Sequence, residues 1–308
     1  MRVGIYKDTL ANGRGADVAV LALAEGLRER GHDAAVFEKP DLTSRIAEPW
    51  DVVISAGTNE LLDLAGIHPV CPVIQQFHTN PKSQFKRKRI FRNWKIRKAL
   101  RKVAAIQVLR EEFLAQVAKC NPKVVVIGNW SEWEGRTQRT GNPESKKIIY
   151  PAALGKGKNQ RLVVQSFASL HEEFPDWSLE LYGGGTPDFT LPDAVKHMGY
   201  CDLGPVYASS AFVAFPSLDE GFPLTLVDAA AFGCPAVMVH DWIGTAAAGG
   251  GIVSEPTVSA YSAALRKLMS NVELIRDMGD AAKRFCREKY SRKFILDKWI
   301  ALLESVVK

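Results

Sequence analysis

The sequence predicts an α/β protein with two halves, each built on a parallel sheet. Short apolar runs of strand length alternate with helical segments on both sides of a polar stretch at residues 135–147. Such alternation is typical of parallel sheets covered by helices. The 308 residues are sufficient for two domains of about 150 residues, each with its own core. We interpret the polar stretch, which has no apolar periodicity, as the interdomain linker.

The first half begins with a strand at residues 3–6, a loop containing Gly13 and Gly15, and a helix over residues 17–30 that ends at Gly31. Val18, Leu21, Leu23 and Leu27 belong to the broad apolar face that we expect this helix to bury. The glycines do not form the G-x-G-x-x-G turn of a nicotinamide dehydrogenase, which disfavours that class. Two interpretations of Gly15 remain open: a contact with a phosphate group, or a tight turn without a ligand. Further strands are predicted at residues 35–37, 51–55, 72–76, 104–109 and 124–127.

The second half starts at residue 148 and repeats the alternation. Strands are predicted at residues 148–150, 178–182, 211–215 and 236–239, with helices near 160–173 and 224–232. Residues 260–307 read as helical, with breaks near Asn271 and Tyr290.

The charge distribution, the cysteines and the apolar runs indicate the cellular compartment of the protein. The net charge is +6, but residues 82–102 contain eleven of the 40 Lys and Arg residues and no acid, so the rest of the chain is net acidic. The five cysteines are far apart and form no C-x-x-C pair, which favours a reducing compartment. The chain begins directly with a strand pattern and has no apolar run of transmembrane length, so we expect a cytoplasmic protein whose membrane contact is peripheral.

Residues 215–237 combine a strand end, a polar loop and a helix with two carboxylates. Pro223 suits the first helical position and Gly233 suits the left-handed residue that ends a helix. Glu220 is therefore expected in a loop at the carboxyl end of a strand. Asp228 follows one turn inside the helix, where its carboxylate can point toward the same crevice.

The run from Glu220 to Asp228, E-G-F-P-L-T-L-V-D, resembles the Glu-x7-Glu signature of the retaining family 4 glycosyltransferases of GT-B fold. Residues 181–185 resemble that family's strand followed by a Gly-x-Gly turn, and residues 198–201 resemble its loop around the nucleotide base. Lys158-Asn159 is similar to the pair that opens its first donor-domain helix. The resemblance is strongest over residues 148–255.

The resemblance implies two Rossmann-like domains facing a central cleft. Residues 1–140 would bind the acceptor, 146–288 the nucleotide sugar, and a helix at 289–308 would cross back to the first domain. The implied activity is retaining, metal-independent transfer of a sugar from a nucleoside diphosphate donor, UDP or GDP, to a saccharide or lipid-linked acceptor. The implied role is assembly of a lipopolysaccharide- or capsule-type glycan, with no cofactor beyond the donor substrate.

The site residues follow from the same resemblance. Glu220 would lie beside the donor sugar, and His78, just after a strand of the first half, would orient the sugar or acceptor. No D-x-D metal motif occurs, so cations and main-chain amides would neutralise the departing phosphate. The donor-binding set is Gly15, Lys156, Lys158, Gly183, Gly184, Tyr200, Gly221, Phe222, Pro223, Leu224, Thr225 and Asp228.

Two positions depart from the family pattern. The second acid is Asp228 rather than Glu, one methylene shorter, yet able to accept hydrogen bonds from a ribose diol. Ala153 stands where the family usually has an Arg, which leaves Lys156 as the nearest second cation, without the bidentate geometry of a guanidinium. These departures motivate an alternative: a catalytically inactive protein of the same fold that binds nucleotide sugars or acts as a scaffold.

The basic segment at residues 83–102 reads as a helix with two apolar faces. One face, with Phe85, Ile96, Ala99, Leu100 and Val103, would pack on the domain. Ile90, Phe91 and Trp94 lie opposite among cations, as expected for an anionic membrane surface. A solvated helix and an acidic glycan acceptor remain open, and nucleic acid is disfavoured because no binding module accompanies the charge. The predicted membrane or acceptor patch comprises Lys86, Arg87, Arg89, Phe91 and Trp94, on a protein at the inner face of the cell membrane.

Overall fold

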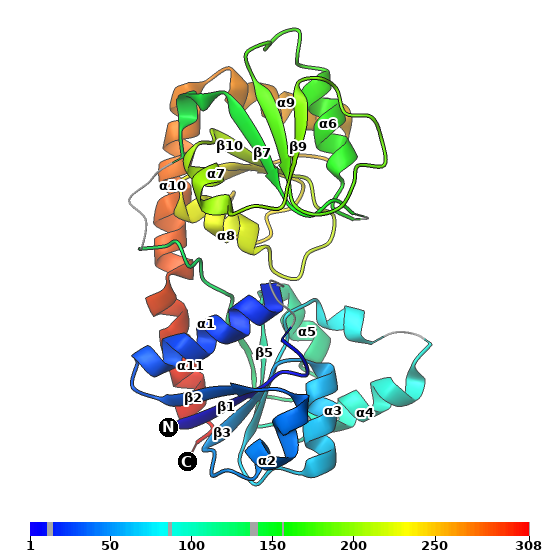
Figure 1. Cartoon of the computed structure of the whole chain (residues 1–308), viewed down its shortest axis with the longest axis vertical. Coiled ribbons are helices and arrows are strands. Elements are labelled where there is room, and N and C mark those ends of the chain that lie inside the picture. The colour runs from blue at the N-terminus through cyan, green and yellow to red at the C-terminus, as the bar shows by residue number, and fades with distance from the viewer. Residues whose placement is uncertain (11–14, 86–87, 136–140, 156, 308) are drawn as a thin grey trace. The chain divides into compact units, whose positions relative to one another are not determined.

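The computed structural model describes residues 1–10, 15–85, 88–135, 141–155 and 157–307. Its chain divides into two compact units (Figure 1). Unit 1 comprises Met1–Asn129 together with Arg292–Lys308, and unit 2 comprises Trp130–Ser291. Each unit contains a six-stranded parallel sheet, so the predicted α/β class with two parallel sheets is confirmed.

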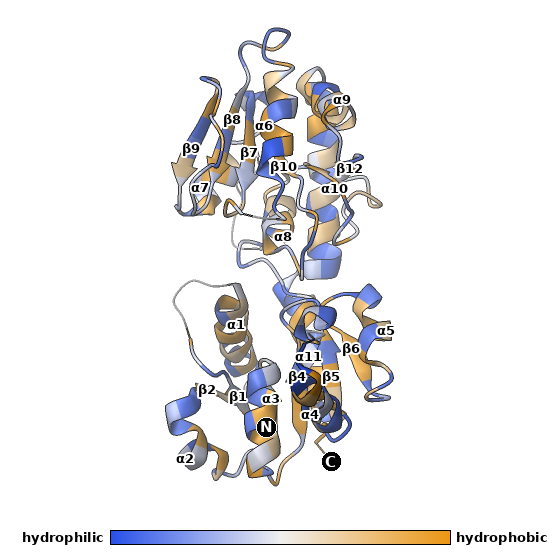
Figure 2. Ribbon diagram, turned by 90° about the vertical axis from the view of Figure 1, so that its right-hand side faces the viewer, coloured by the Kyte–Doolittle hydropathy of each residue, from blue (hydrophilic) through white to orange (hydrophobic). Residues whose placement is uncertain are grey.

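The sheet of unit 1 has the strand order β2-β1-β3-β4-β5-β6. Its strands are short and apolar, and β5 and β6 are predominantly hydrophobic in Figure 2. They are β1 (Arg2–Tyr6), β2 (Asp33–Phe37), β3 (Val52–Ser55), β4 (Val73–Gln76), β5 (Ala105–Val108) and β6 (Val124–Val126). The helices are α1 (Gly15–Glu29), α2 (Leu42–Ile46), α3 (Thr58–Ile67), α4 (Ile90–Leu100), α5 (Leu114–Val117) and α11 (Arg292–Glu304).

Helix α11 belongs to unit 1 because it packs on α1. A Cβ built on Gly26 of α1 would come within 2.7 Å of the Leu296 side chain, so the two helices approach closely where a side chain is absent. Arg292 Nη2 adds an ion pair of 3.1 Å to the Glu29 carboxylate. The expected burial of Val18 and Leu21 in α1 is wrong, since they are 44% and 48% exposed and the helix buries a narrower stripe.

The sheet of unit 2 has the order β12-β11-β10-β7-β8-β9, with β7 paired to β10 and β8. Its strands are β7 (Lys147–Pro151), β8 (Ser178–Tyr182), β9 (Val195–Gly199), β10 (Phe212–Phe215), β11 (Ala236–Met238) and β12 (Gly251–Val253). Its helices are α6 (Gln160–Ala168), α7 (Leu203–Ala208), α8 (Leu224–Ala231), α9 (Val258–Met269) and α10 (Val272–Tyr290).

The predicted breaks in the final helical segment are confirmed. The Asn271 side chain accepts a hydrogen bond of 2.9 Å from the Leu274 amide and so caps α10. Ser291, in an extended conformation, ends α10 and separates it from α11. Two expectations were wrong in extent: α6 ends at Ala168 rather than near residue 173, and the basic helix covers only Ile90–Leu100.

The basic segment nevertheless has the predicted division of faces. Ile96, Ala99 and Leu100 are buried, whereas Phe91 and Trp94 are 85% and 59% exposed. Phe85 lies outside α4, with the Arg97 guanidinium 4.9 Å from its ring centre. Arg89 is exposed at the position just before the helix. Lys86 and Arg87, which we included in the predicted patch, lie outside the described residues.

Candidate functional site

Strand β10 and helix α8 form the predicted strand–loop–helix unit. Pro223 occupies the position immediately before α8, with φ −80° and ψ 90°, and Gly233 ends the helix with φ +69°. Glu220 therefore lies in the loop beyond the carboxyl end of β10, together with Gly221. Parallel α/β sheets bind ligands at this edge.

Lys158 and Glu220 are brought together by the sheet. Lys158 Nζ donates a hydrogen bond of 2.5 Å to Glu220 Oε1, although 62 residues separate them in sequence. The Glu220 side chain is only 10% exposed and that of Lys158 is 32% exposed. The two loops are also joined through the main chain, since the Leu218 amide donates to the Gly157 carbonyl at 2.9 Å. Both predicted residues thus share one partly buried ion pair at the ends of β7 and β10.

The glycine turn after β8 lies against the loop after β7. Gly183 has φ +122°, and a Cβ there would come within 2.7 Å of the main chain of Ala152 and Ala153. The Leu154 amide donates a hydrogen bond of 2.8 Å to the Gly184 carbonyl. Gly184 is exposed, and a Cβ at that position would meet nothing within 4 Å. The turn thus needs glycine at residue 183, whereas the space beside Cα of residue 184 is empty. Lys156, the expected second cation, lies outside the described residues.

Asp228 has an intramolecular partner that we did not predict. Ser131 Oγ donates a hydrogen bond of 2.6 Å to Asp228 Oδ1, and the Ser131 hydroxyl in turn accepts from the Trp133 amide at 3.1 Å. Burial raises the pKa of Asp228 to about 7, the Ser131 hydrogen bond opposes this rise, and the nearby Glu132 carboxylate adds to it. The available signal was a hydroxyl residue shortly after β6.

The remaining predicted donor residues differ in what their side chains do. Thr225 Oγ1 donates to the Pro151 carbonyl at 3.1 Å and so ties α8 to β7. The Phe222 ring packs edge-on against Tyr290, with ring centres 5.6 Å apart. Tyr200 is 82% exposed after β9. Leu224 begins α8 and is half-buried. Main-chain contacts to a donor therefore remain a prediction for residues 221–225.

His78 lines a polar pocket of about 240 Å³ in unit 1, at the carboxyl ends of β1, β3 and β4. Within the described residues neither ring nitrogen of His78 has a hydrogen-bond partner, although both are buried. Burial and the Lys7 ammonium lower the pKa of His78 to about 4, against an opposing effect of Glu60. The buried Gln76 side chain, 2% exposed, also faces the pocket with an unpartnered Oε1 in this part of the structure. The pocket thus holds buried polar atoms that protein groups do not satisfy.

Ion pairs and the start of α3 complete this pocket. Lys7 Nζ and Glu60 Oε1 lie 2.8 Å apart, and Glu60 is 3% exposed. Arg92 of α4 donates to Thr58 Oγ1 at 3.2 Å and to Asn59 Oδ1 at 2.8 Å. Sequence reasoning missed these residues because they lie outside any family motif that we recognised. Gly15 is the exposed first residue of α1, and its neighbour Ala16 lines the pocket.

Residues 145–271, which contain the Lys158–Glu220 pair, match the family model described as "Glycosyl transferases group 1". This part of the chain is a group 1 glycosyltransferase domain. The predicted group 1 glycosyltransferase is thereby confirmed for this domain, and the predicted GT-B fold is supported over almost the whole chain. The structure of Anabaena HepE in complex with UDP and glucose superposes with a TM-score of 0.79 at 13% identity, covering 99% of this chain and 100% of that one.

The curated relatives that match this chain are longer proteins. An exopolysaccharide phosphotransferase of Streptomyces coelicolor is 27% identical over 62% of this chain and 22% of its own length. An uncharacterized glycosyltransferase of Haemophilus influenzae is 26% identical over 52% of this chain and 49% of its own. The chain therefore spans half or less of the length of these two relatives.

Proposed function

We propose that this protein transfers a sugar from a nucleoside diphosphate donor to a saccharide or lipid-linked acceptor, with retention of configuration and without a metal ion. The observation that carries the proposal is the Lys158–Glu220 ion pair, held at 2.5 Å within the matched glycosyltransferase domain. A cation and a carboxylate at one sheet edge supply the two charges that the reaction requires. We further propose that the product belongs to a lipopolysaccharide- or capsule-type surface glycan.

The chemistry requires breaking the anomeric C–O bond while negative charge grows on the departing phosphate. In our proposal Lys158 neutralises that charge, assisted by main-chain amides at the start of α8. Glu220 lies next to the donor sugar, where its carboxylate contacts hydroxyl groups and stabilises positive character at the anomeric carbon. In the free protein the two side chains neutralise each other, and the donor diphosphate would recruit the ammonium from the carboxylate.

The ribose and base would lie on either side of this pair. Asp228 would accept hydrogen bonds from the ribose diol in place of the Ser131 hydroxyl, and the exposed Gly184 would approach the diphosphate. The UDP in the HepE structure supports a nucleoside diphosphate donor. The position of Tyr200 in the loop after β9 supports a contact with the base.

The pocket of unit 1 is our candidate for the acceptor or sugar side. Its lining contains both donors and acceptors, and the lowered pKa of His78 keeps the ring neutral near pH 7, so that one nitrogen accepts and the other donates. Such a lining suits hydroxyl groups. The exposed Arg89, Phe91 and Trp94 support peripheral contact of α4 with an anionic membrane at its cytoplasmic face, where lipid-linked acceptors occur.

The first test is donor identity. Thermal-shift measurements with UDP-, GDP-, ADP- and CMP-sugars should give one strong response, because a ligand at 100 times its Kd adds about 2.7 kcal/mol of stability. Transfer and donor hydrolysis are then measured with the responding sugar in EDTA. Full activity in EDTA is expected, and loss of activity that Mg²⁺ or Mn²⁺ restores would contradict metal independence.

The second test concerns the ion pair. Glu220→Gln should lower turnover by about a hundredfold or more while nucleotide still binds, and Lys158→Met should weaken both binding and turnover. Lys146→Met is the matched control, because Lys146 pairs at 2.7 Å with Asp176 on the exposed surface of the same unit. Turnover by Glu220→Gln equal to that of the unaltered protein would refute the assignment.

The alternative is a nucleotide-sugar-binding or scaffold protein without turnover. Two observations favour it: Ala153 supplies no cation beside the glycine turn, and the Asp228 carboxyl is already bound by Ser131. Tight nucleotide-sugar binding with no hydrolysis and no transfer to any acceptor fraction would select this alternative.

A further inference from the structure

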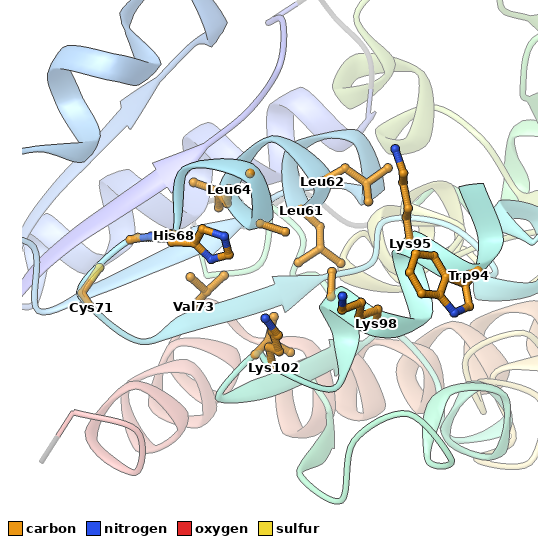
Figure 3. Close-up of a pocket in the computed structure, with 15 residues that line it drawn as sticks. Leu61, Leu62, Leu64, His68, Cys71, Val73, Trp94, Lys95, Lys98 and Lys102 are labelled. Carbon is orange, nitrogen blue, oxygen red and sulfur yellow. The ribbon is translucent and has the colours of Figure 1, made fainter. Parts of the chain in front are cut away.

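Helices α3 and α4 enclose a second cavity of unit 1, of about 500 Å³, that the proposed reaction does not use. Figure 3 shows leucines of α3 on one side of this cavity, and Lys98 of α4 and Lys102 just after it on the other. Leu61 and Leu64 form buried parts of its wall, and Ala65, Val73 and Ala99 add further apolar surface. We refer to it as the α3–α4 groove. Its volume and apolar lining are those of a site for a small organic ligand rather than of a packing defect.

The polar groups of the groove are cations. Lys95 and Lys98 of α4 and Lys102, just after that helix, line it and are exposed. No Asp or Glu is among the 15 lining residues. Within the part of the chain that the structure describes, none of the three lysines has an acidic partner. The apolar floor is thus bordered by three positive charges that the protein does not neutralise.

Exposed hydrophobic side chains occur among the lining residues and next to them in sequence. Trp94 lines the groove at 59% exposure, with Lys98 Nζ 5.2 Å from its ring centre. Ile67 and Val70, at the end of α3, are 42% and 107% exposed. Apolar surface therefore continues from the cavity to the outside of the unit.

We propose that the α3–α4 groove binds one anionic amphiphile, with its alkyl chain against the leucines of α3 and its phosphate head at Lys95, Lys98 and Lys102. Lysine suits this role because its methylene stem can line the apolar wall while its ammonium stays at the rim. The site extends the proposed membrane contact of α4 from a surface patch to a pocket for a single lipid.

The geometry favours a lipid over a peptide. The two side walls are helices, whose main-chain groups bond within the helix, and β4, which contributes Val73, is paired with β3 and β5. The groove therefore offers no free strand edge for peptide pairing. An acidic helix or a second copy of this chain is the competing occupant. It would require a wide interface, whereas the observed feature is a cavity with its polar groups on one side.

The test uses alkyl phosphates of increasing length, below their critical micelle concentrations, in calorimetric titrations without nucleotide or acceptor. The outcome is then independent of the transfer assay. Affinity should rise about fourfold for each added methylene until the groove is full, because burial of a methylene contributes about 0.8 kcal/mol. Inorganic phosphate should not compete with decyl phosphate, and decyl maltoside should bind more weakly.

Two kinds of variant locate the ligand. Lys98→Gln and Lys102→Gln should each weaken decyl phosphate about fivefold at low salt and leave decyl maltoside unchanged. Gly66→Phe should abolish binding of both, because Gly66 lines the groove and a Cβ there meets nothing within 4 Å. Lys119→Gln, at an exposed lysine away from the groove, is the charge control. Circular dichroism verifies that Gly66→Phe folds, and the lysine variants test the site if it does not.

The proposal is overturned by any of three results. The first is an affinity for alkyl phosphates that does not depend on chain length. The second is a loss of affinity for decyl phosphate in Lys119→Gln equal to that in Lys98→Gln and Lys102→Gln. The third is binding of decyl phosphate that persists in a folded Gly66→Phe protein. Self-association in sedimentation that Gly66→Phe or decyl phosphate disrupts would assign the groove to a second copy instead.

Discussion

Replacing Asp228 by Asn should make the protein more stable at neutral and alkaline pH. Burial raises the pKa of this carboxyl group from 3.8 to about 7 in the folded protein. Between these two values the folded state holds a proton that the unfolded chain has released. Raising the pH therefore lowers the free energy of unfolding of the unaltered protein, and Asn, which does not titrate, removes that dependence.

The expected size follows from the shift. About three pKa units at 1.36 kcal/mol each give at most about 4 kcal/mol, reached near pH 7 and constant above it. In a domain of this size, each kcal/mol changes the melting temperature by about 2 to 4 °C. Below pH 4 the carboxyl is protonated in both states, so the variant and the unaltered protein should melt at similar temperatures. At pH 8 the variant should melt up to about 8 to 16 °C higher.

The assay is scanning calorimetry of both proteins from pH 4 to pH 8, with the transition of unit 2 compared at each pH. Asp280→Asn makes the same change in charge at an exposed position of the same unit and serves as the control. The reasoning would be refuted by a difference in melting temperature between Asp228→Asn and the unaltered protein that stays constant with pH. A difference that grows toward acid would show that the carboxyl is stabilised as the anion.

Three further predictions concern the two sites. Ser131→Ala removes a hydrogen bond to a charged group, which contributes about 1.5 to 3 kcal/mol. The pKa of Asp228, followed by carbon NMR, should therefore rise by about one to two units, and an unchanged pKa would rule out this partner. The pKa of His78 is lowered from 6.5 to about 4, so its ring protons should show no NMR titration between pH 5.5 and 8, and a midpoint near 6.5 would contradict its burial. The same shift should lower the free energy of unfolding as the pH falls from 6.5 toward 4, because the unfolded chain binds the proton first. Gly183→Ala should destabilise unit 2 by about 1 to 3 kcal/mol, because its φ is +122° and a Cβ would approach the main chain to 2.7 Å, whereas Gly184→Ala should melt unchanged; equal melting of the two variants would be inconsistent with the turn.

Local sequence determined most of the strands and both ends of α8, whereas helices α2, α3, α5 and α7 escaped prediction. Apolar runs of four or five residues indicated most strands, and Pro223 and Gly233 marked both ends of α8 because their backbone preferences act without neighbours. The position of Glu220 beyond a strand followed from the same signals. Strands β9 and β12 escaped prediction, since β9 carries a charged and a histidine residue and β12 begins within a run of three glycines, which signals a turn.

The sequence by itself therefore determined the α/β class, the glycosyltransferase motif and the two faces of α4. The tertiary structure alone decided which residues meet: the sheet order places β7 beside β10, so that Lys158 reaches Glu220, and Ser131 reaches Asp228 across 97 positions of sequence. It also decided that α3 and α4 leave a groove between them. The physical reason is that periodicity and backbone preference depend on neighbours in sequence, whereas burial, pKa and pairing depend on how the sheet brings distant segments together.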